Sequence, residues 1–147
     1  MRTALAASAL AVLGLAAAPA VADTPKQGYY IDPSSQVYVI VTKDRKAIKS
    51  FQGNCNFKTA TGDPTSSGSL YTGKATRIKI GPSGSFSYSG TLLLPSGSGG
   101  PATRVKGKVT GSFKNGKAKG TYEVTTAGVA CEKTTFSGRY YGVNPKG

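Results

Sequence analysis

The sequence predicts an all-β protein, an antiparallel sandwich or a curled barrel of about seven to nine strands with one disulfide. Segments with a two-residue alternation of apolar and polar side chains recur along the chain, bounded by Gly, Pro, Asn, Asp or Ser. No capped 3.6-residue apolar repeat follows residue 22. Glycines inside the expected strands favour strong curvature; they are Gly107, Gly111, Gly120 and Gly138.

The first 22 residues have the pattern of a secretory signal peptide. Met1 and Arg2 give a charged start, an apolar run covers residues 4–18, and small residues lead to Ala22. The run is shorter than a membrane span requires, so no membrane span is expected. Cleavage after Ala22 would release a secreted, monomeric protein with an N-terminal lead (23–35), a β-domain (36–143) and a tail (144–147).

The first half of the β-domain predicts a hairpin followed by a long loop. A short edge strand is expected at residues 29–31, and residues 36–42 form an apolar, β-branched run that indicates a strand buried on both faces. After a charged turn at 43–46, a second strand returns over 47–52. Residues 53–73 are rich in Gly, Asn, Ser and Thr, which predicts a compact loop region that holds Cys55.

Alternation predicts three further strands and the direction of their side chains. Residues 76–80 place Ile78 and Ile80 on one face and basic side chains on the other. Two sets of side chains should point inward, from strands at 85–94 and 135–143. They are Phe86, Tyr88, Gly90, Leu92 and Leu94 in the first, and Phe136, Gly138, Tyr140 and Gly142 in the second. The second cysteine loop is expected at 127–133.

The clearest element is a hairpin over residues 105–126 that turns at Asn115-Gly116. Asn-Gly suits both φ > 0 positions of a type I′ turn, which puts Lys114 opposite Lys117. Phe113 then faces Ala118, Gly111 faces Gly120, Val109 faces Tyr122, Gly107 faces Val124 and Lys108 faces Glu123. One face is apolar and packs on the core, and the other is wet and cationic.

The chain has two cysteines, Cys55 and Cys131. Export to an oxidising compartment makes their pairing the expected outcome. Such a disulfide would join the two cysteine loops, and the chain-entropy description assigns it about 4 kcal/mol. Two cysteines without any histidine do not supply the four ligands of a usual zinc site, so no metal or cofactor is expected.

Charge supplies the best functional candidate. The chain has 19 Lys and Arg against 6 Asp and Glu, a net charge of +13. The basic face of the hairpin and outward positions on other strands offer an anion-binding surface. The candidate residues are Lys106, Lys108, Lys114, Lys117, Lys119, Arg77, Lys79, Arg139 and Tyr141. The expected partner is an anionic extracellular polymer. Equally, lysines on exposed strands protect a β-protein from aggregation.

Other function classes find less support. Without histidine there is no His-based triad or HExxH site, so the chain is expected not to be an enzyme. The aromatic side chains of the strands point inward by parity, which argues against specific nucleic-acid recognition. Two alternatives stay open: a secreted hydrolase that uses Asp63 or Glu132, and a protease inhibitor that presents the 53–73 loop.

The chain also resembles small exported bacterial β-domains of largely uncharacterised type. The resemblance spans about residues 37–141, from Cys55 through Ile78-Lys79-Ile80, Gly84-Ser85-Phe86 and Val109-Thr110-Gly111-Ser112-Phe113 to the Asn115-Gly116 hairpin, Cys131 and Phe136. It implies an extracytoplasmic β-fold with one disulfide, and it implies no activity.

Overall fold

The structure is a computed structural model that describes residues 23–58, 64–95, 99–126 and 130–143. The predicted signal peptide and tail lie outside the described residues, as does Asp63. Every regular element in the described ranges is a strand, which confirms the all-β prediction. The strands are β1 (Gly28–Asp32), β2 (Val37–Val41), β3 (Ala47–Lys58), β4 (Pro64–Thr72), β5 (Ile78–Lys79), β6 (Ser85–Leu94), β7 (Thr103–Lys114), β8 (Lys117–Val124) and β9 (Ala130–Gly142).

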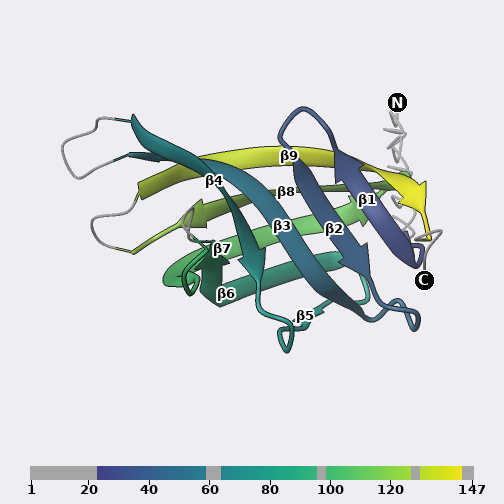
Figure 1. The fold of residues 1–147 in the computed structure, drawn as a ribbon. Helices are drawn as coiled ribbons and strands as arrows, with labels where there is room; N and C mark the ends of the chain where they lie inside the picture. Colours follow the sequence, from purple (N-terminus) through teal and green to yellow (C-terminus); the bar gives the residue numbers. More distant parts are fainter. Residues whose placement is uncertain (1–22, 59–63, 96–98, 127–129, 144–147) are drawn as a thin grey trace, which may run out of the picture.

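The strands form a closed antiparallel barrel, one of the two predicted architectures (Figure 1). The wall runs in chain order through β1, β2, β3, β4, β6, β7, β8 and β9, and β9 pairs again with β1. Short turns join most of these neighbours, as antiparallel pairing allows. β5 has two residues and lies outside the wall, where it pairs with β3.

The hairpin of β7 and β8 has the predicted turn and register. Asn115 and Gly116 have φ angles of 52° and 68°, as a type I′ turn requires. Lys114 pairs with Lys117, and the pairing continues in step to Gly107 and Val124. The whole set of expected cross-strand partners is confirmed, since the turn fixes the register of both strands.

The inward side chains fill the barrel. Tyr30, Phe51, Leu92 and Tyr122 are fully buried, and the aromatic rings contact one another edge to face. The ring centroids of Phe51 and Tyr122, for example, lie 5.4 Å apart. Phe86, Phe113 and Phe136 are also buried, so the predicted inward direction of the strand aromatics is confirmed.

The long loop expected at 53–73 is instead mostly a hairpin. β3 continues to Lys58, and β4 returns from Pro64 in register with it. Gly53 has a packing role inside β3, because a Cβ at this position would lie 2.8 Å from the ring of Tyr122. At Gly53, the glycine that indicated a loop is therefore required by the close approach of a core ring.

Two further expectations on the first strands were wrong. β1 is no edge strand and belongs to the barrel, although it lies within the predicted lead, because it pairs with both β2 and β9. β2 is buried on one face only, with Val37, Val39 and Val41 inward and Tyr38 39% exposed. A barrel wall is a single layer, so one face of each strand is directed outward.

The predicted disulfide between Cys55 and Cys131 is present. The cysteines lie within β3 and β9, however, and the expectation that they would lie in loops was wrong. β3 reaches across to pair with β9 at Phe57 and Cys131, and the Cα atoms of the two cysteines are 5.8 Å apart. The bond therefore joins two strands of the wall that are 76 residues apart in the sequence.

Asp32 secures the end of β1 against β9. Its buried carboxylate accepts hydrogen bonds from the hydroxyls of Ser34 (2.6 Å) and Ser35 (2.7 Å) and from the backbone N–H of Ser137 (2.7 Å). Burial alone would raise the pKa of this carboxyl, but the hydrogen bonds from Ser34, Ser137 and Ser35 outweigh it and lower the pKa to about 2.

We expect Asp32→Asn to lower the free energy of unfolding by about 1.5–3 kcal/mol, the range for hydrogen bonds to a charged group. Because the folded pKa lies below the usual value, this stabilisation is present above about pH 4 and is lost as the pH falls towards 2. Denaturant unfolding of the wild type and the variant between these pH values measures the effect.

Asp44→Asn is the control for burial: the Asp44 carboxylate also accepts hydrogen bonds, from the Thr42 hydroxyl and the Lys46 N–H, and they lower its pKa too, but it is fully exposed. Its loss should therefore cost less than the loss of Asp32. An Asp32→Asn variant that unfolds like the wild type at neutral pH would contradict the role assigned to the buried carboxylate.

Candidate functional site

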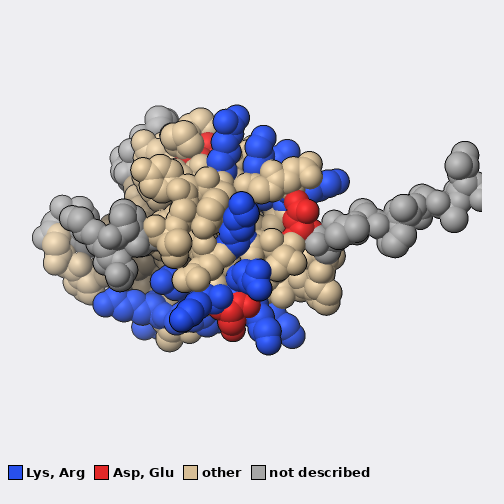
Figure 2. Space-filling model, turned by 90° about the vertical axis from the view of Figure 1, so that its right-hand side faces the viewer, with Lys and Arg blue, Asp and Glu red and all other residues tan. Residues whose placement is uncertain are grey.

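One end of the barrel gathers basic side chains. The turns of β2–β3, β5–β6 and β7–β8 meet there, and backbone hydrogen bonds join them: Ile80 to Lys46 (2.9 Å), Phe113 to Gly84 (2.9 Å) and Tyr140 to Gly116 (3.3 Å). Figure 2 shows Lys and Arg side chains on several sides of this end. We call it the basic end, and its cations are Lys26, Lys43, Arg45, Lys46, Lys79, Lys114, Lys117 and Arg139.

The N-terminal segment 23–27 lies across the basic end. The Asp23 carboxylate accepts the backbone N–H of Asn115 at the tip of the β7–β8 turn. The Lys26 N–H donates to the hydroxyl of Tyr30 (2.7 Å), and Tyr140 donates its hydroxyl to the carbonyl of Gln27 (2.9 Å). These contacts hold the segment over the core, and the Lys26 ammonium lies 5.2 Å from the centre of the Tyr140 ring.

Three cations lie side by side where β7, β8 and β9 reach the basic end. Lys114 pairs with Lys117, and Lys117 pairs with Arg139 on the next strand. We call these three residues the basic row. Lys119 follows Lys117 on the same face of β8 and is exposed. Like charges directly opposite each other are destabilising, so the basic row is electrostatically unfavourable on its own.

A band of hydroxyl side chains separates the basic row from the other hairpin lysines. Ser112 lies between Ser85 and Lys119, and Thr110 lies between Ser87 and Thr121. Beyond this band, Lys108 faces Glu123, and the Lys106 ammonium is 3.4 Å from the hydroxyl of Thr91. The hairpin therefore carries two cationic groups, since Lys108 lies about 20 Å and Lys106 about 27 Å from Lys114 along the strand.

Arg77 and Lys79 do not belong to the hairpin face. β5 pairs with β3, and one Arg77 guanidinium nitrogen donates to the carbonyls of Lys74 (2.9 Å) and Thr76 (3.0 Å). Lys79 instead joins Arg45 and Lys46 around a hollow of about 440 Å³ at the basic end. Tyr141, by contrast, is 76% exposed and follows Arg139 on the outer face of β9.

The turn at 43–46 supplies cations that sequence reasoning did not assign to the site. Its charged run predicts a turn, and only the fold places that turn beside Lys79 and the N-terminal segment. Arg45 has a φ of 61°, and it lines both this hollow and a second one formed with Lys26, Lys43 and Tyr140. The run Lys43-Asp44-Arg45-Lys46 was the available signal.

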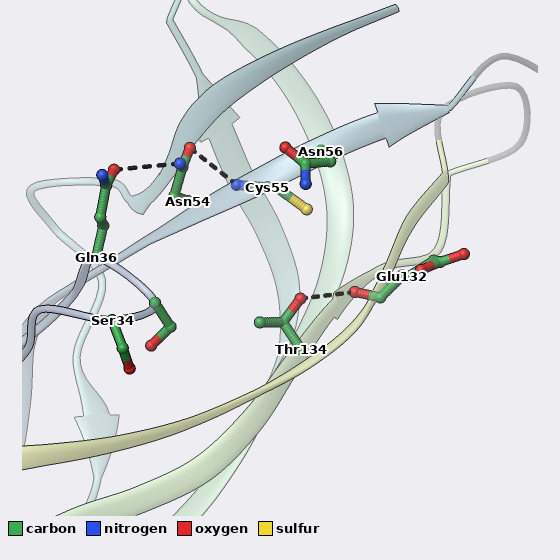
Figure 3. A pocket seen from close by; sticks show the side chains of 8 residues that line it. Ser34, Gln36, Asn54, Cys55, Asn56, Glu132 and Thr134 are labelled. Atoms are coloured by element: carbon green, nitrogen blue, oxygen red, sulfur yellow. Dashed lines mark hydrogen bonds between the residues drawn. The ribbon is translucent and has the colours of Figure 1, made fainter. Parts of the chain in front are cut away.

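Glu132, a candidate acid of the hydrolase alternative, lines a hollow in the barrel wall (Figure 3). Its other described lining residues are Ser34, Ser35, Gln36, Asn54, Cys55, Asn56 and Thr134, so it is the one carboxylate among them. A glycosidase mechanism requires two carboxyl groups across one cleft. Nowhere in the described ranges do three His, Cys, Asp or Glu side chains form a group that could hold a metal ion.

Comparisons with protein-family models, curated proteins and solved structures found no match to this chain. The resemblance to exported bacterial β-domains stays a prediction. In the described part of the chain, no helix is long and apolar enough to cross a membrane.

We expect Lys117→Thr to stabilise the protein at low salt, because it removes the central charge of the basic row and places a β-branched residue in a strand. The expected gain in the free energy of unfolding is about 0.2–1 kcal/mol. The electrostatic part should shrink as salt screens the charges.

Urea denaturation of Lys117→Thr and Lys106→Thr at low and high salt measures this gain. Lys106 is exposed and pairs with Thr91 in a regular ladder outside the basic row, so it controls for the change in strand propensity. An equal salt dependence in the two variants would contradict the repulsion.

Proposed function

We propose that this protein is a secreted, non-catalytic binding domain that holds anionic polymers on its basic surface. The observation that carries the proposal is the basic row, in which Lys114, Lys117 and Arg139 are aligned on three adjacent strands. An anionic polymer would neutralise these charges and relieve their mutual repulsion. Phosphate and carboxylate groups fit this surface, since Arg and Lys donate to both.

The closed barrel weakens the other explanation of the lysines, protection of exposed strand edges. β7 is paired along its length with β6 and β8, and β8 is paired with β7 and β9. Neither strand therefore has a free edge to protect. These charges also contribute to solubility, and that contribution does not conflict with binding. Solubility alone, however, does not require three cations in register on adjacent strands.

The disulfide and the predicted signal peptide support secretion as part of this proposal. Disulfides persist in oxidising compartments outside the cytosol. Lys119 would extend the surface along β8, and Tyr141 would add an aromatic ring beside Arg139. Lys106 and Lys108 would form a second cationic group beyond the band of hydroxyls.

The test is retention on a polyphosphate or heparin column as the salt concentration rises. The variant Lys114→Gln, Lys117→Gln, Arg139→Gln should elute at clearly lower salt than the wild type, since each lost contact reduces counterion release. The control is Lys49→Gln, Lys74→Gln, Lys133→Gln, which removes the same charge from exposed positions outside the basic row.

Equal elution of the two triple variants would show that only net charge matters, and it would overturn the assigned surface. The folded state of each variant can be verified by near-UV circular dichroism, which reports the packing of the buried tyrosines.

A further inference from the structure

The barrel wall has a hollow of about 370 Å³ beside the disulfide (Figure 3). The β1–β2 turn bounds it on one side through Ser34, Ser35 and Gln36, while β3 and β9 bound the others. The wall is open here because the β1–β2 hairpin ends at this turn, whereas β3 continues until it pairs with β9 at Phe57 and Cys131. The volume falls in the range of small-ligand sites.

The hollow presents hydrogen-bond donors and acceptors side by side. The Asn54 amide donates to the side-chain oxygen of Gln36 (3.1 Å), which leaves the amide nitrogen of Gln36 as a donor at the rim. Asn56 contributes a second exposed amide. The hydroxyls of Ser34 and Ser35 donate to Asp32, so their oxygens keep the capacity to accept.

An aromatic surface continues from the hollow along the outer face of the wall. Tyr38 lies on β2, two residues after Gln36 of the β1–β2 turn. It pairs with Gln52 on β3, which in turn pairs with Tyr71 on β4. The inward burial of the neighbouring residues places all three side chains outward. Two tyrosines thus flank an amide, about 10 Å apart across three strands.

This region differs from the rest of the surface in charge. Described outward side chains on β2 and on β3 between Ser50 and Asn54 carry no charge, and neither do Ser69 and Tyr71 on β4. The one titratable group that lines the hollow among the described residues is the Glu132 carboxylate. The described lining offers no Lys or Arg side chain to an anionic ligand, so a neutral ligand suits it better.

Two cross-links hold the backing of the hollow. The buried Tyr122 donates its hydroxyl to the carbonyl of Asn54, and the Cys55–Cys131 disulfide closes the far edge. Gln36 is held at a φ of 52°, which is uncommon for a residue with a side chain and directs the turn towards β3. A preformed polar hollow loses little conformational freedom when it binds.

We propose that this hollow and the adjoining Tyr38–Gln52–Tyr71 row bind a neutral oligosaccharide. Each sugar hydroxyl both donates and accepts hydrogen bonds, which matches the mixed amides and hydroxyls of the hollow. The apolar face of a sugar ring packs on a tyrosine ring, and two outward tyrosines about 10 Å apart suit a chain of several sugars. This site is separate from the basic end and does not rest on the proposed binding of anions.

The test is isothermal titration calorimetry of the full chain with three neutral probes: N-acetylchitotetraose, cellotetraose and maltotetraose. At least one should bind, and added salt should leave its affinity unchanged because no charge is neutralised. Gln36→Gly and Tyr38→Ala should each weaken that binding by about 3- to 10-fold. Glycine is chosen at position 36 because it accepts a positive φ without strain, so folding is preserved.

Tyr141→Ala is the matched control, since it removes an exposed tyrosine near the basic end. It should leave the affinity unchanged. Failure of all three probes to bind would overturn the proposal, and so would binding that survives both Gln36→Gly and Tyr38→Ala. Either failure is distinct from that of the anion-binding proposal, whose measure is salt-dependent retention of the basic-row variant.

Discussion

Closure of the sheet on itself is the constraint on which the rest of the molecule depends. β9 returns to β1, so each wall strand pairs with the next one around the barrel, and a single interior takes the buried side chains. The buried Asp32 carboxylate secures this closure by holding the β1–β2 turn and the backbone of β9 together. Because the inward side chains form the core, the outward side chains do not have to pack against another layer. Their chemistry can therefore differ from one side of the barrel to the other.

That outer surface carries two kinds of chemistry. Strands β7, β8 and β9 present cations and hydroxyls, whereas β2, β3 and β4 present tyrosines and amides. The first set is suited to charged partners and the second to neutral ones, for which directional hydrogen bonds and ring contacts matter more than field strength. Alternation along each strand makes this division possible, because every second residue is free of the core.

Local patterns in the sequence predicted much of this fold. The Asn115-Gly116 turn fixed the register of β7 and β8, and the parity of Phe86 and Phe136 identified core positions. The predictions from sequence were wrong where the role of a residue depends on a contact with a residue that is distant in the sequence. Read locally, the glycine at position 53 indicates a loop. The contact that requires glycine there is with the ring of Tyr122, which lies far away in the sequence. The same limit applies to the candidate sites. Arg45 and Lys79 line one hollow only in the folded barrel, and Tyr38 and Tyr71 are brought to the two sides of Gln52 only there.

The segment across the basic end also determines how the molecule could be tethered. Lys26 and Val143 line one hollow, so the described chain enters and leaves the barrel at nearly the same place (Figure 1). A short linker between these positions would therefore permit circular permutation, with new termini opened in another turn. Attachment to a surface through either end would shield the cations around that end, while the hollow near the disulfide would stay accessible on the side of the wall.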